Sequence, residues 1–317
     1  MKICVTGALG HIGSYLIRKL DMVALIKVYL VDNLLTQRYV SLFDLPPGIK
    51  YCFRQVDILS PEIEEIIKDS DIVVHLAAIT DAESSFRNAE SINKVNKEGL
   101  KYIAETCAKY RKKIIFFSTT SVYGSQRKIV DENCSIEDLK PQSPYAESKL
   151  YGERLLLDLS REAGLKFIVL RLGTIFGYAI GMRFHTAVNK FIWQASLGQE
   201  ISIWKTALRQ KRPYCGLNDC VNAIKYIVNN EIFDCQIYNI VTINLTVKDI
   251  IDTIREYVPY LNTKFVDSPI MNQLSYCVSN KKSLNKGFSY IDDLKLLTQE
   301  TLYKLCNVNY EVKKKIF

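Results

Sequence analysis

Tyr145 and Lys149 are the two side chains of this sequence whose types and spacing could move a proton. Residues four apart share one face of a helix, so the phenol and the amine would lie side by side. An ammonium group beside a phenol favours the phenolate and lowers the tyrosine pKa from about 10 toward neutral pH. Such a pair could take the proton of an alcohol while a nicotinamide accepts its hydride, although Tyr-x-x-x-Lys alone also arises often by chance.

A hydroxyl-rich segment strengthens this interpretation of the pair. It reads Phe117-Ser118-Thr119-Thr120-Ser121-Val122-Tyr123-Gly124 and follows an apolar run that predicts a strand over 114–117. Open α/β sheets bind their ligands at the carboxyl ends of such strands. The Thr119 hydroxyl could therefore hydrogen-bond the same substrate oxygen as Tyr145.

Three glycines near the amino terminus indicate a nucleotide site. Gly7, Gly10 and Gly13 lie between an apolar run and a helical pattern, where bare backbone can approach a pyrophosphate. The spacing G-x-x-G-x-x-G is also compatible with a simple tight turn. Asp32 ends the next apolar run about 20 residues on, where a carboxylate binds both ribose hydroxyls and repels a 2′-phosphate. We therefore predict NAD rather than NADP, with a plain loop acid as the alternative for Asp32.

The elements that must position these residues alternate along the chain. Short apolar runs at 3–6, 28–31, 72–76, 114–117 and 167–170 read as strands, and 12–20, 92–110 and 145–163 read as helices. This alternation predicts a doubly wound parallel α/β sheet. We expect a dinucleotide-binding domain over 1–176 and a smaller, mainly substrate-binding domain over 177–317, with the segment near 212–241 rejoining the sheet.

Composition excludes several classes of protein. The 317 residues are 48% hydrophobic and 24% charged, and 42 Lys and Arg against 34 Asp and Glu give +8. No apolar run reaches the ~20 residues of a membrane span. The basic residues are spread along the chain, which argues against nucleic acid. Nine scattered cysteines and three separated histidines predict no metal site and a reducing, cytoplasmic compartment.

Taken together, the motifs resemble the extended short-chain dehydrogenase/reductase family, in its NAD-dependent nucleotide-sugar epimerase/dehydratase branch. The resemblance covers about residues 1–241. It rests on motifs that occur in one order: Gly7/Gly10/Gly13, Asp32, Asp57-Ile58, His75-Leu76-Ala77-Ala78, Ser118-Thr119, Val122-Tyr123-Gly124, and Ser143-Pro144-Tyr145 with Lys149. It implies a Rossmann sheet that binds NAD, a nucleotide-sugar substrate, and a homodimer formed through helices 92–110 and 145–163.

The resemblance also assigns residue roles. Thr119, Tyr145 and Lys149 would be catalytic, with Lys149 also holding the nicotinamide ribose. Asn96 resembles a buried asparagine beneath the cofactor, and a purely structural role is its alternative. The cofactor-binding set is Gly7, Gly10, His11, Ile12, Gly13, Asp32, Asn33, Asp57, Ile58, Leu76, Ala77, Ala78, Asn96, Ser118, Tyr145 and Lys149. The substrate-binding set is Thr80, Thr119, Ser121, Thr174 and Arg212.

The substrate side departs from the family pattern. Arg212 opens a segment whose arginine commonly contacts the substrate diphosphate, but Thr174 stands where many relatives carry asparagine. Beyond Arg255 the chain has no arginine, so Lys281 or Lys282 could replace the second diphosphate-binding arginine of many relatives. The chemistry is therefore better supported than the identity of the substrate.

We predict an NAD-dependent epimerase of a nucleotide-activated sugar. A hydride would leave a hydroxyl-bearing carbon, giving a keto intermediate, and return to its opposite face with Tyr145 as acid and base. Thr120-Ser121 stand where 4,6-dehydratases carry Asp-Glu, which argues against dehydration. A sugar-nucleotide reductase, dehydrogenase or dehydratase is one alternative, and a non-catalytic dinucleotide-binding sensor is another. The sequence specifies neither the sugar nor the nucleotide nor the carbon.

Overall fold

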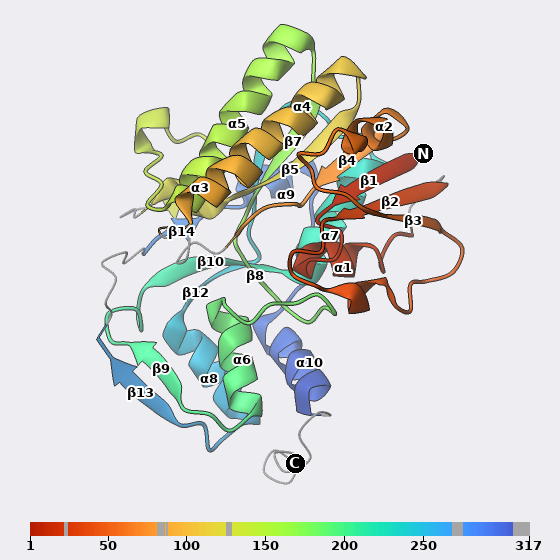
Figure 1. The fold of residues 1–317 in the computed structure, drawn as a ribbon. Coiled ribbons are helices and arrows are strands. Elements are labelled where there is room, and N and C mark those ends of the chain that lie inside the picture. Colours follow the sequence, from red (N-terminus) through yellow and green to blue (C-terminus); the bar gives the residue numbers. More distant parts are fainter. Residues whose placement is uncertain (22–24, 81–85, 87, 125–128, 268–274, 307–317) are drawn as a thin grey trace.

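Seven strands form the central sheet of the molecule (Figure 1). The computed structural model describes residues 1–317 except 22–24, 81–85, 87, 125–128, 268–274 and 307–317. All neighbouring strands pair in parallel. The strand order is β11-β7-β5-β4-β1-β2-β3, with β1 (Lys2–Thr6), β2 (Lys27–Asp32), β3 (Lys50–Gln55), β4 (Ile72–His75), β5 (Lys113–Thr119), β7 (Lys166–Leu172) and β11 (Ile237–Ile240). The predicted doubly wound parallel sheet is confirmed.

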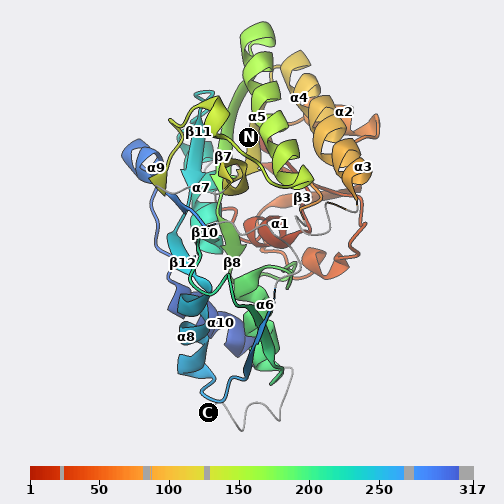
Figure 2. The same ribbon diagram turned by 90° about the vertical axis from the view of Figure 1, so that its left-hand side faces the viewer.

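Helices cover both faces of this sheet because its strands are apolar on both faces. On β1, Ile3 and Val5 pack into the core beneath α1 (His11–Leu16) and α7 (Leu217–Asn229). Cys4 points the other way, into a second core that is closed by α2 (Glu62–Lys68), α4 (Leu100–Lys109) and α5 (Pro144–Ala163). Figures 1 and 2 show α4 and α5 side by side on this second face.

Helix α5 carries Tyr145 in its first turn, so its start fixes the position of the phenol. Ser143 caps the helix by accepting a hydrogen bond from the Ala146 amide at 3.2 Å, and Pro144 occupies the first turn. The helix ends at Gly164, whose φ of 68° is the left-handed conformation of a C-terminal cap. These signals explain why the helix predicted over 145–163 agrees with the structure.

The helix predicted over 92–110 is divided in the structure. It begins with α3 (Ala89–Ile92), continues as the wider π-helical segment η3 (Asn93–Gly99), and ends with α4. Such π-helical insertions are frequent at functional sites. This one contains Asn96, whose amide is hydrogen-bonded outside the helix, as described below.

The second half of the chain builds a smaller part below the sheet (Figure 1). Its core includes Phe176, Ile192 and Ile254. Its elements are β8 (Thr174–Phe176), α6 (Ala187–Ser196), β9 (Ile201–Trp204), β10 (Lys211–Gly216), β12 (Ile243–Thr246), α8 (Val247–Tyr257), β13 (Thr263–Val266) and α10 (Leu294–Cys306). Strand β11 lies in the main sheet, whereas β10 pairs with β8 and β12. The domain boundary at residue 176 stays a prediction.

Short elements complete the fold. Strands β6 (Ile129–Val130) and β14 (Cys277–Val278) pair beside the main sheet, and α9 (Lys281–Lys286) follows them. The 3₁₀ turns are η1 (Tyr39–Leu42), η4 (Thr120–Tyr123) and η5 (Ile136–Asp138). No helix in the described part of the chain is long and apolar enough to cross a membrane.

Candidate active site

The predicted site residues gather at the carboxyl edge of the main sheet. Gly7 follows β1, Asp32 ends β2, Leu76 follows β4, and Thr119 ends β5. The strand order reverses at β1, because the chain runs outward through β2 and β3 and then returns to β4 on the other side of β1. Ligands of open α/β sheets bind in the crevice at such a switch point.

The glycine loop leaves no room for a larger side chain at Gly7 or Gly13, so its backbone there is bare. Gly7 has a φ of 66°, and a Cβ there would lie 2.7 Å from the Ala77 amide nitrogen. A Cβ on Gly13 would lie 2.6 Å from the Gly7 carbonyl oxygen. A Cβ on Gly10 would meet the Gly7 oxygen only at 3.3 Å and the Arg38 guanidinium at 4.0 Å. Gly10 is therefore the least crowded of the three glycines, and a pyrophosphate would approach the loop most easily there.

A segment from the second half of the chain covers this loop. His11 Nε2 lies 2.8 Å from the Gly177 carbonyl, and since a carbonyl only accepts, Nε2 carries the proton. Burial lowers the pKa of His11 to about 4, so the ring is neutral at pH 7. The Gly181 amide donates to Ser14 Oγ at 2.9 Å. His11, predicted to bind the cofactor, thus joins two parts of the chain through its ring.

The predicted adenosine side is rigid. The Asp32 carboxylate accepts hydrogen bonds from the Leu9 amide at 3.2 Å and from the Leu34 amide at 2.9 Å. Asn33 Nδ2 donates to Asp57 Oδ2 at 2.7 Å. Each Asp32 oxygen keeps a free lone pair, so the carboxylate is held in place and can still accept hydrogen bonds from ribose hydroxyls.

We expect Asp32 to set the choice of cofactor. The wild-type protein, stripped of nucleotide, should bind NAD at least about tenfold more tightly than NADP, because the carboxylate repels a 2′-phosphate. Asp32→Ala should weaken NAD binding and bring the affinities for NAD and NADP closer together. Calorimetric titration of both cofactors measures these affinities, with the exposed Glu62→Ala as the control for loss of one negative charge. Equal affinities of the wild type would contradict the assignment.

Thr119, Tyr145 and Lys149 meet at the chemical centre. Thr119 hydrogen-bonds the phenol of Tyr145, and its hydroxyl also donates to Ser121 Oγ at 3.2 Å. Lys149 Nζ lies 4.9 Å from the ring centre of Phe116 and 5.9 Å from that of Tyr145. The structure therefore brings the three predicted catalytic side chains together.

The electrostatics of this pair differ from the sequence prediction. Burial raises the pKa of Tyr145 to about 12, although the charge of Arg183 and the hydrogen bond from Thr119 oppose the rise. Burial also lowers the pKa of Lys149 to about 7. The prediction that the tyrosine pKa falls toward neutral pH is wrong for the chain by itself, because desolvation by burial is the largest influence on this pKa.

The buried amine of Lys149 should make stability depend on pH. Below pH 7 the folded chain holds a buried charge, and this penalty fades as the pH rises from about 7 toward the ordinary lysine value of 10.5. Lys149→Met should therefore raise the melting temperature of nucleotide-free protein at pH 6 by several degrees, and much less at pH 10. Thermal unfolding at both pH values measures the difference, with the exposed Lys101→Met as control. An equal effect at both values would contradict the buried charge.

A buried ion pair lies directly behind the centre. Arg171 of β7 binds Glu153 of α5 through two hydrogen bonds, Nε–Oε1 at 2.8 Å and Nη2–Oε2 at 2.6 Å. Ser118 Oγ donates to Glu153 Oε1 at 2.5 Å, and Arg171 Nη1 donates to the Tyr123 hydroxyl at 2.9 Å. The Ser118 side chain, predicted to bind the cofactor, thus points into this network. A cofactor role for Ser118 stays a prediction, and the backbone atoms of Ser118 would have to make the contact.

Asn96 is also engaged within the protein. Its amide exchanges two hydrogen bonds with the Ile79 backbone, at 2.8 and 2.9 Å, and donates to Ser148 Oγ at 3.1 Å. It therefore ties the loop that follows Ala77 and Ala78 to helix α5. This supports the structural alternative for Asn96, which would position the cofactor loop from beneath.

Tyr276 is a site residue that the sequence analysis missed. Its hydroxyl lies 3.4 Å from Thr120 Oγ1 and hydrogen-bonds Ser121, and the charge of Arg212 acts on it. The Tyr276 amide donates to the Lys211 carbonyl at 3.0 Å. A buried tyrosine thus links Ser121 to Arg212, two predicted substrate-binding residues. Thr174 lies on the neighbouring strand β8, opposite Tyr214 in the pairing of β8 with β10.

We expect Arg212 to anchor the substrate. If its guanidinium binds a diphosphate, Arg212→Ala should raise KM by roughly 10–100-fold and change kcat little, because the contact is made equally in ground and transition states. Steady-state kinetics with a sugar nucleotide checks this, with the exposed Arg209→Ala as the matched control. An unchanged KM would move the diphosphate elsewhere, with Lys281 and Lys282 as the next residues to replace.

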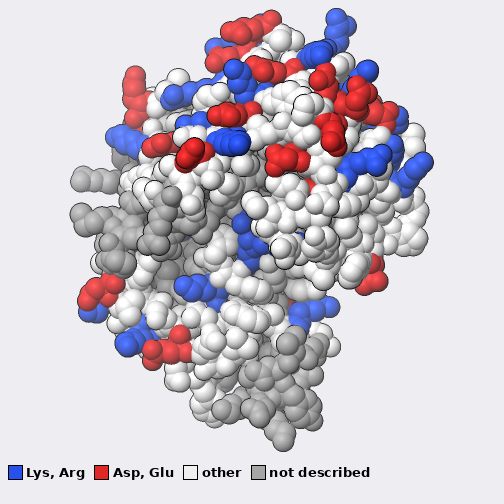
Figure 3. All heavy atoms as spheres, viewed as in Figure 1, with Lys and Arg blue, Asp and Glu red and all other residues white. Residues whose placement is uncertain are grey.

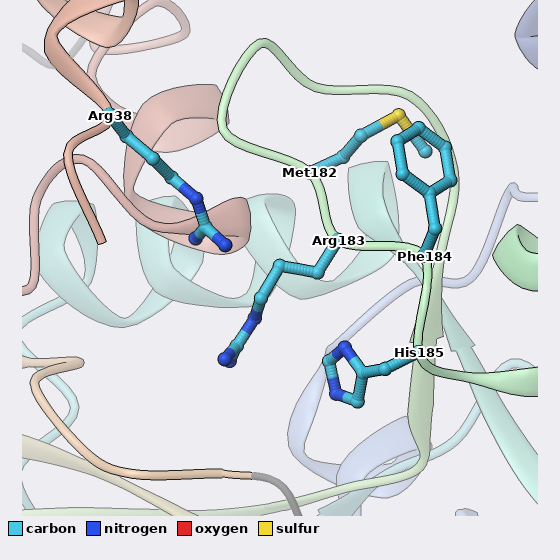
Figure 4. Close-up of a pocket in the computed structure, with 5 residues that line it drawn as sticks. All are labelled: Arg38, Met182, Arg183, Phe184 and His185. Atoms are coloured by element: carbon cyan, nitrogen blue, oxygen red, sulfur yellow. The ribbon is translucent and has the colours of Figure 1, made fainter.

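A basic pocket of about 520 Å³ lies beside the glycine loop. Its lining residues are Arg38, Met182, Arg183, Phe184 and His185, and Figure 4 shows the two arginine side chains converging from different segments. Arg183 also donates a hydrogen bond to Thr80, a predicted substrate-binding residue. The sequence analysis missed this group because no motif marks the 182–185 segment.

The charged side chains visible in the hollowed middle of this face are basic, whereas acidic and basic groups mix above it (Figure 3). No group of three or more His, Cys, Asp or Glu side chains in the described residues could hold a metal ion.

The family model described as "NAD dependent epimerase/dehydratase family" matches residues 3–240. The chain belongs to this family. That membership confirms the predicted family, NAD as the cofactor, and an enzyme of the epimerase/dehydratase type. The residues that fit NAD are the glycine loop, Asp32 and the Asn33–Asp57 pair described above.

Two curated relatives show the range of the family. The chain is 30% identical over 237 residues to "Uncharacterized UDP-glucose epimerase YtcB" of Bacillus subtilis (strain 168), covering 72% of each chain. It is 31% identical over 263 residues to the dTDP-D-glucose 4,6-dehydratase of Dictyostelium discoideum, covering 76% of this chain and 58% of that one.

Among solved structures, the UDP-glucuronic acid 4-epimerase of Bacillus cereus, in complex with UDP-glucuronic acid and NAD, superposes with a TM-score of 0.88 at 24% identity. The match covers 97% of this chain and 100% of that one, which confirms the fold over nearly the whole chain.

Proposed function

We propose that this protein is an NAD-dependent epimerase of a nucleotide-activated sugar. The observation that carries the proposal is the meeting of Thr119, Tyr145 and Lys149 beside the glycine loop, at the carboxyl edge of the sheet. NAD, when bound, accepts a hydride from the sugar carbon and gives it back, and its positively charged ring favours the phenolate. The other steps fall to the chain's own residues.

Tyr145 exchanges the proton of the reacting hydroxyl. Its phenolate oxygen takes the proton as the hydride leaves, and its phenol returns the proton when the hydride comes back on the opposite face. Thr119 hydrogen-bonds the phenol and orients it toward the substrate oxygen. Burial lowers the pKa of Lys149 to about 7, so its amine can exchange protons near neutral pH. Lys149 therefore favours neither the phenol nor the phenolate form of Tyr145 strongly.

The hydroxyl-rich segment over 117–124 argues against a dehydratase. Elimination of water needs an acid and a base near the sugar, and Thr120 and Ser121 supply only hydroxyl groups. Thr120 Oγ1 donates to the Leu172 carbonyl at 3.2 Å, and the buried Glu153 is held by Arg171. An epimerase, which needs one acid/base group and a reversible hydride carrier, fits these side chains better than a dehydratase.

For the substrate we propose a hexose attached to a pyrimidine nucleoside diphosphate. The two relatives near 30% identity carry UDP-glucose and dTDP-D-glucose in their names. The basic side chains in the hollow of Figure 3 suit a substrate with two phosphates. Arg212 would bind the diphosphate, and Thr174, Ser121 and Thr80 would contact the sugar.

We further propose a cytoplasmic homodimer. Helices α4 and α5 lie side by side at the surface. Tyr151 on α5 is 37% exposed, and Tyr102 of α4 and Leu155 of α5 are partly buried. The eight cysteines whose side chains are described are free thiols, which suits a reducing compartment. Sedimentation should give a dimer for the wild type and a monomer for Tyr151→Glu; a monomeric wild type would exclude the dimer.

The function is tested on the purified protein. Mass spectrometry of the ligands released on denaturation should find NAD, and NMR should show UDP-glucose converted to an epimer without accumulation of NADH. Stoichiometric NADH would instead identify a dehydrogenase, and a 4-keto-6-deoxy product a dehydratase. A protein that binds NAD but converts none of the UDP- and dTDP-hexoses would support the sensor alternative.

A further inference from the structure

Arg38 reaches from the loop after β2 into the basic pocket, although the roles proposed above leave it unused. Its side chain is half-buried, and its Nη1 lies 4.0 Å from the position of a Cβ on Gly10. Figure 4 shows its guanidinium directed into the pocket, toward that of Arg183 on the other side. Arg38 therefore lies beside Gly10, the least crowded of the three glycines of the loop.

The charges around Arg38 leave this corner positive. Burial lowers the pKa of Arg38, the charge of Arg183 lowers it further, and Asp32 opposes them. His11 is neutral at pH 7 because its pKa is lowered to about 4. Asp32 is the carboxylate whose charge favours Arg38, and it is already held by two backbone amides. A partly desolvated positive corner of this kind is stabilised by an anion.

We infer that Arg38 binds the pyrophosphate of NAD beside Gly10 of the glycine loop. The inference rests on the proposed function, because it takes the cofactor to lie across Asp32 and Gly10. Between these residues, the ribose held by Asp32 is followed by the phosphates beside Gly10. The Arg38 guanidinium lies near both, and its fork of N–H groups matches two phosphate oxygens.

The same guanidinium could instead bind a 2′-phosphate, since arginines near this strand end do so in NADP-binding folds. The geometry favours the pyrophosphate. Asp32 is held by hydrogen bonds from the Leu9 and Leu34 amides, at a position where its charge would repel a 2′-phosphate. Arg38 is turned toward Gly10 and Arg183, along the direction of the phosphates.

The test is binding to nucleotide-free protein, so it needs no turnover. NAD, ADP-ribose, NADP and adenosine are titrated calorimetrically into wild type, Arg38→Gln and Arg38→Lys. Arg54→Gln, which removes an exposed arginine at the end of β3, is the control for net charge. Circular dichroism and the melting temperature show whether each variant is folded.

Arg38→Gln should weaken NAD and ADP-ribose by at least tenfold, leave adenosine unchanged, and reduce the salt dependence of NAD binding. Arg38→Lys should recover part of the loss. Unchanged NAD affinity in Arg38→Gln would overturn the inference, and so would an equal loss for adenosine. A loss confined to NADP would assign Arg38 to the 2′-phosphate instead. A wild type that binds none of the dinucleotides would overturn the proposed function itself, which keeps the two failures distinct.

Discussion

Replacing Tyr145 with phenylalanine should lower kcat by about 10²–10⁴-fold, roughly 3–5 kcal/mol of activation barrier. The substitution removes one oxygen from a half-buried ring, so the fold and NAD content should survive. The values of kcat and kcat/KM should fall by the same factor, because Tyr145 interacts with the moving proton only in the transition state. Steady-state kinetics of the interconversion, with NAD content measured in the same preparation, checks the expectation.

Tyr260→Phe offers a matched control for this experiment. It makes the same chemical change at a side chain that is 82% exposed and lies outside every site proposed above. It should keep full activity. Near-normal turnover of Tyr145→Phe would show that another group moves the proton, and the sensor alternative would need a new test.

Lys149→Met should have the second largest effect on activity. We expect a loss of kcat similar in size, about 10²–10⁴-fold, and in addition weaker NAD binding, because Lys149 is proposed both to support the phenol and to hold the nicotinamide ribose. Calorimetric NAD binding separates the two roles. Thr119→Val should lower kcat less than Lys149→Met, because the Thr119 hydroxyl orients the phenol and transfers no proton to the sugar.

The expected pattern distinguishes the proposed roles of Lys149. Weaker NAD binding with unchanged kcat at saturating NAD would show that Lys149 only contacts the ribose. A lower kcat with unchanged NAD binding would show that Lys149 acts only in the proton relay. Lys101→Met, on the exposed side of the neighbouring α4, should change neither quantity.

The chemical centre could be predicted because each of its parts lies within one element. Tyr145 and Lys149 share one helix, and Thr119 ends one strand, so local periodicity suffices to place them. The glycine loop and Asp32 follow from the same strand–turn–helix pattern. Family membership and the arrangement of strands agree with these predictions.

Tyr276, Arg183 and Arg38 could not be predicted in the same way. Tyr276 meets Thr120 across 156 positions of sequence, and Arg183 meets Thr80 across 103. Such contacts depend on how the smaller part of the chain packs on the sheet, which no local pattern specifies. The sign of the Tyr145 pKa shift escaped prediction for a related reason: spacing shows that an amine is near, but burial decides which effect is larger.

Strand β11 has a consequence for any attempt to divide the chain. It pairs along the whole of its length with β7, with Ile237 opposite Val169, although 65 positions separate Ile237 from Leu172 at the end of β7. A fragment ending near residue 176 would present β7 as a naked edge with unpaired amide and carbonyl groups. Such a fragment should self-associate through that edge rather than fold as a free nucleotide-binding unit.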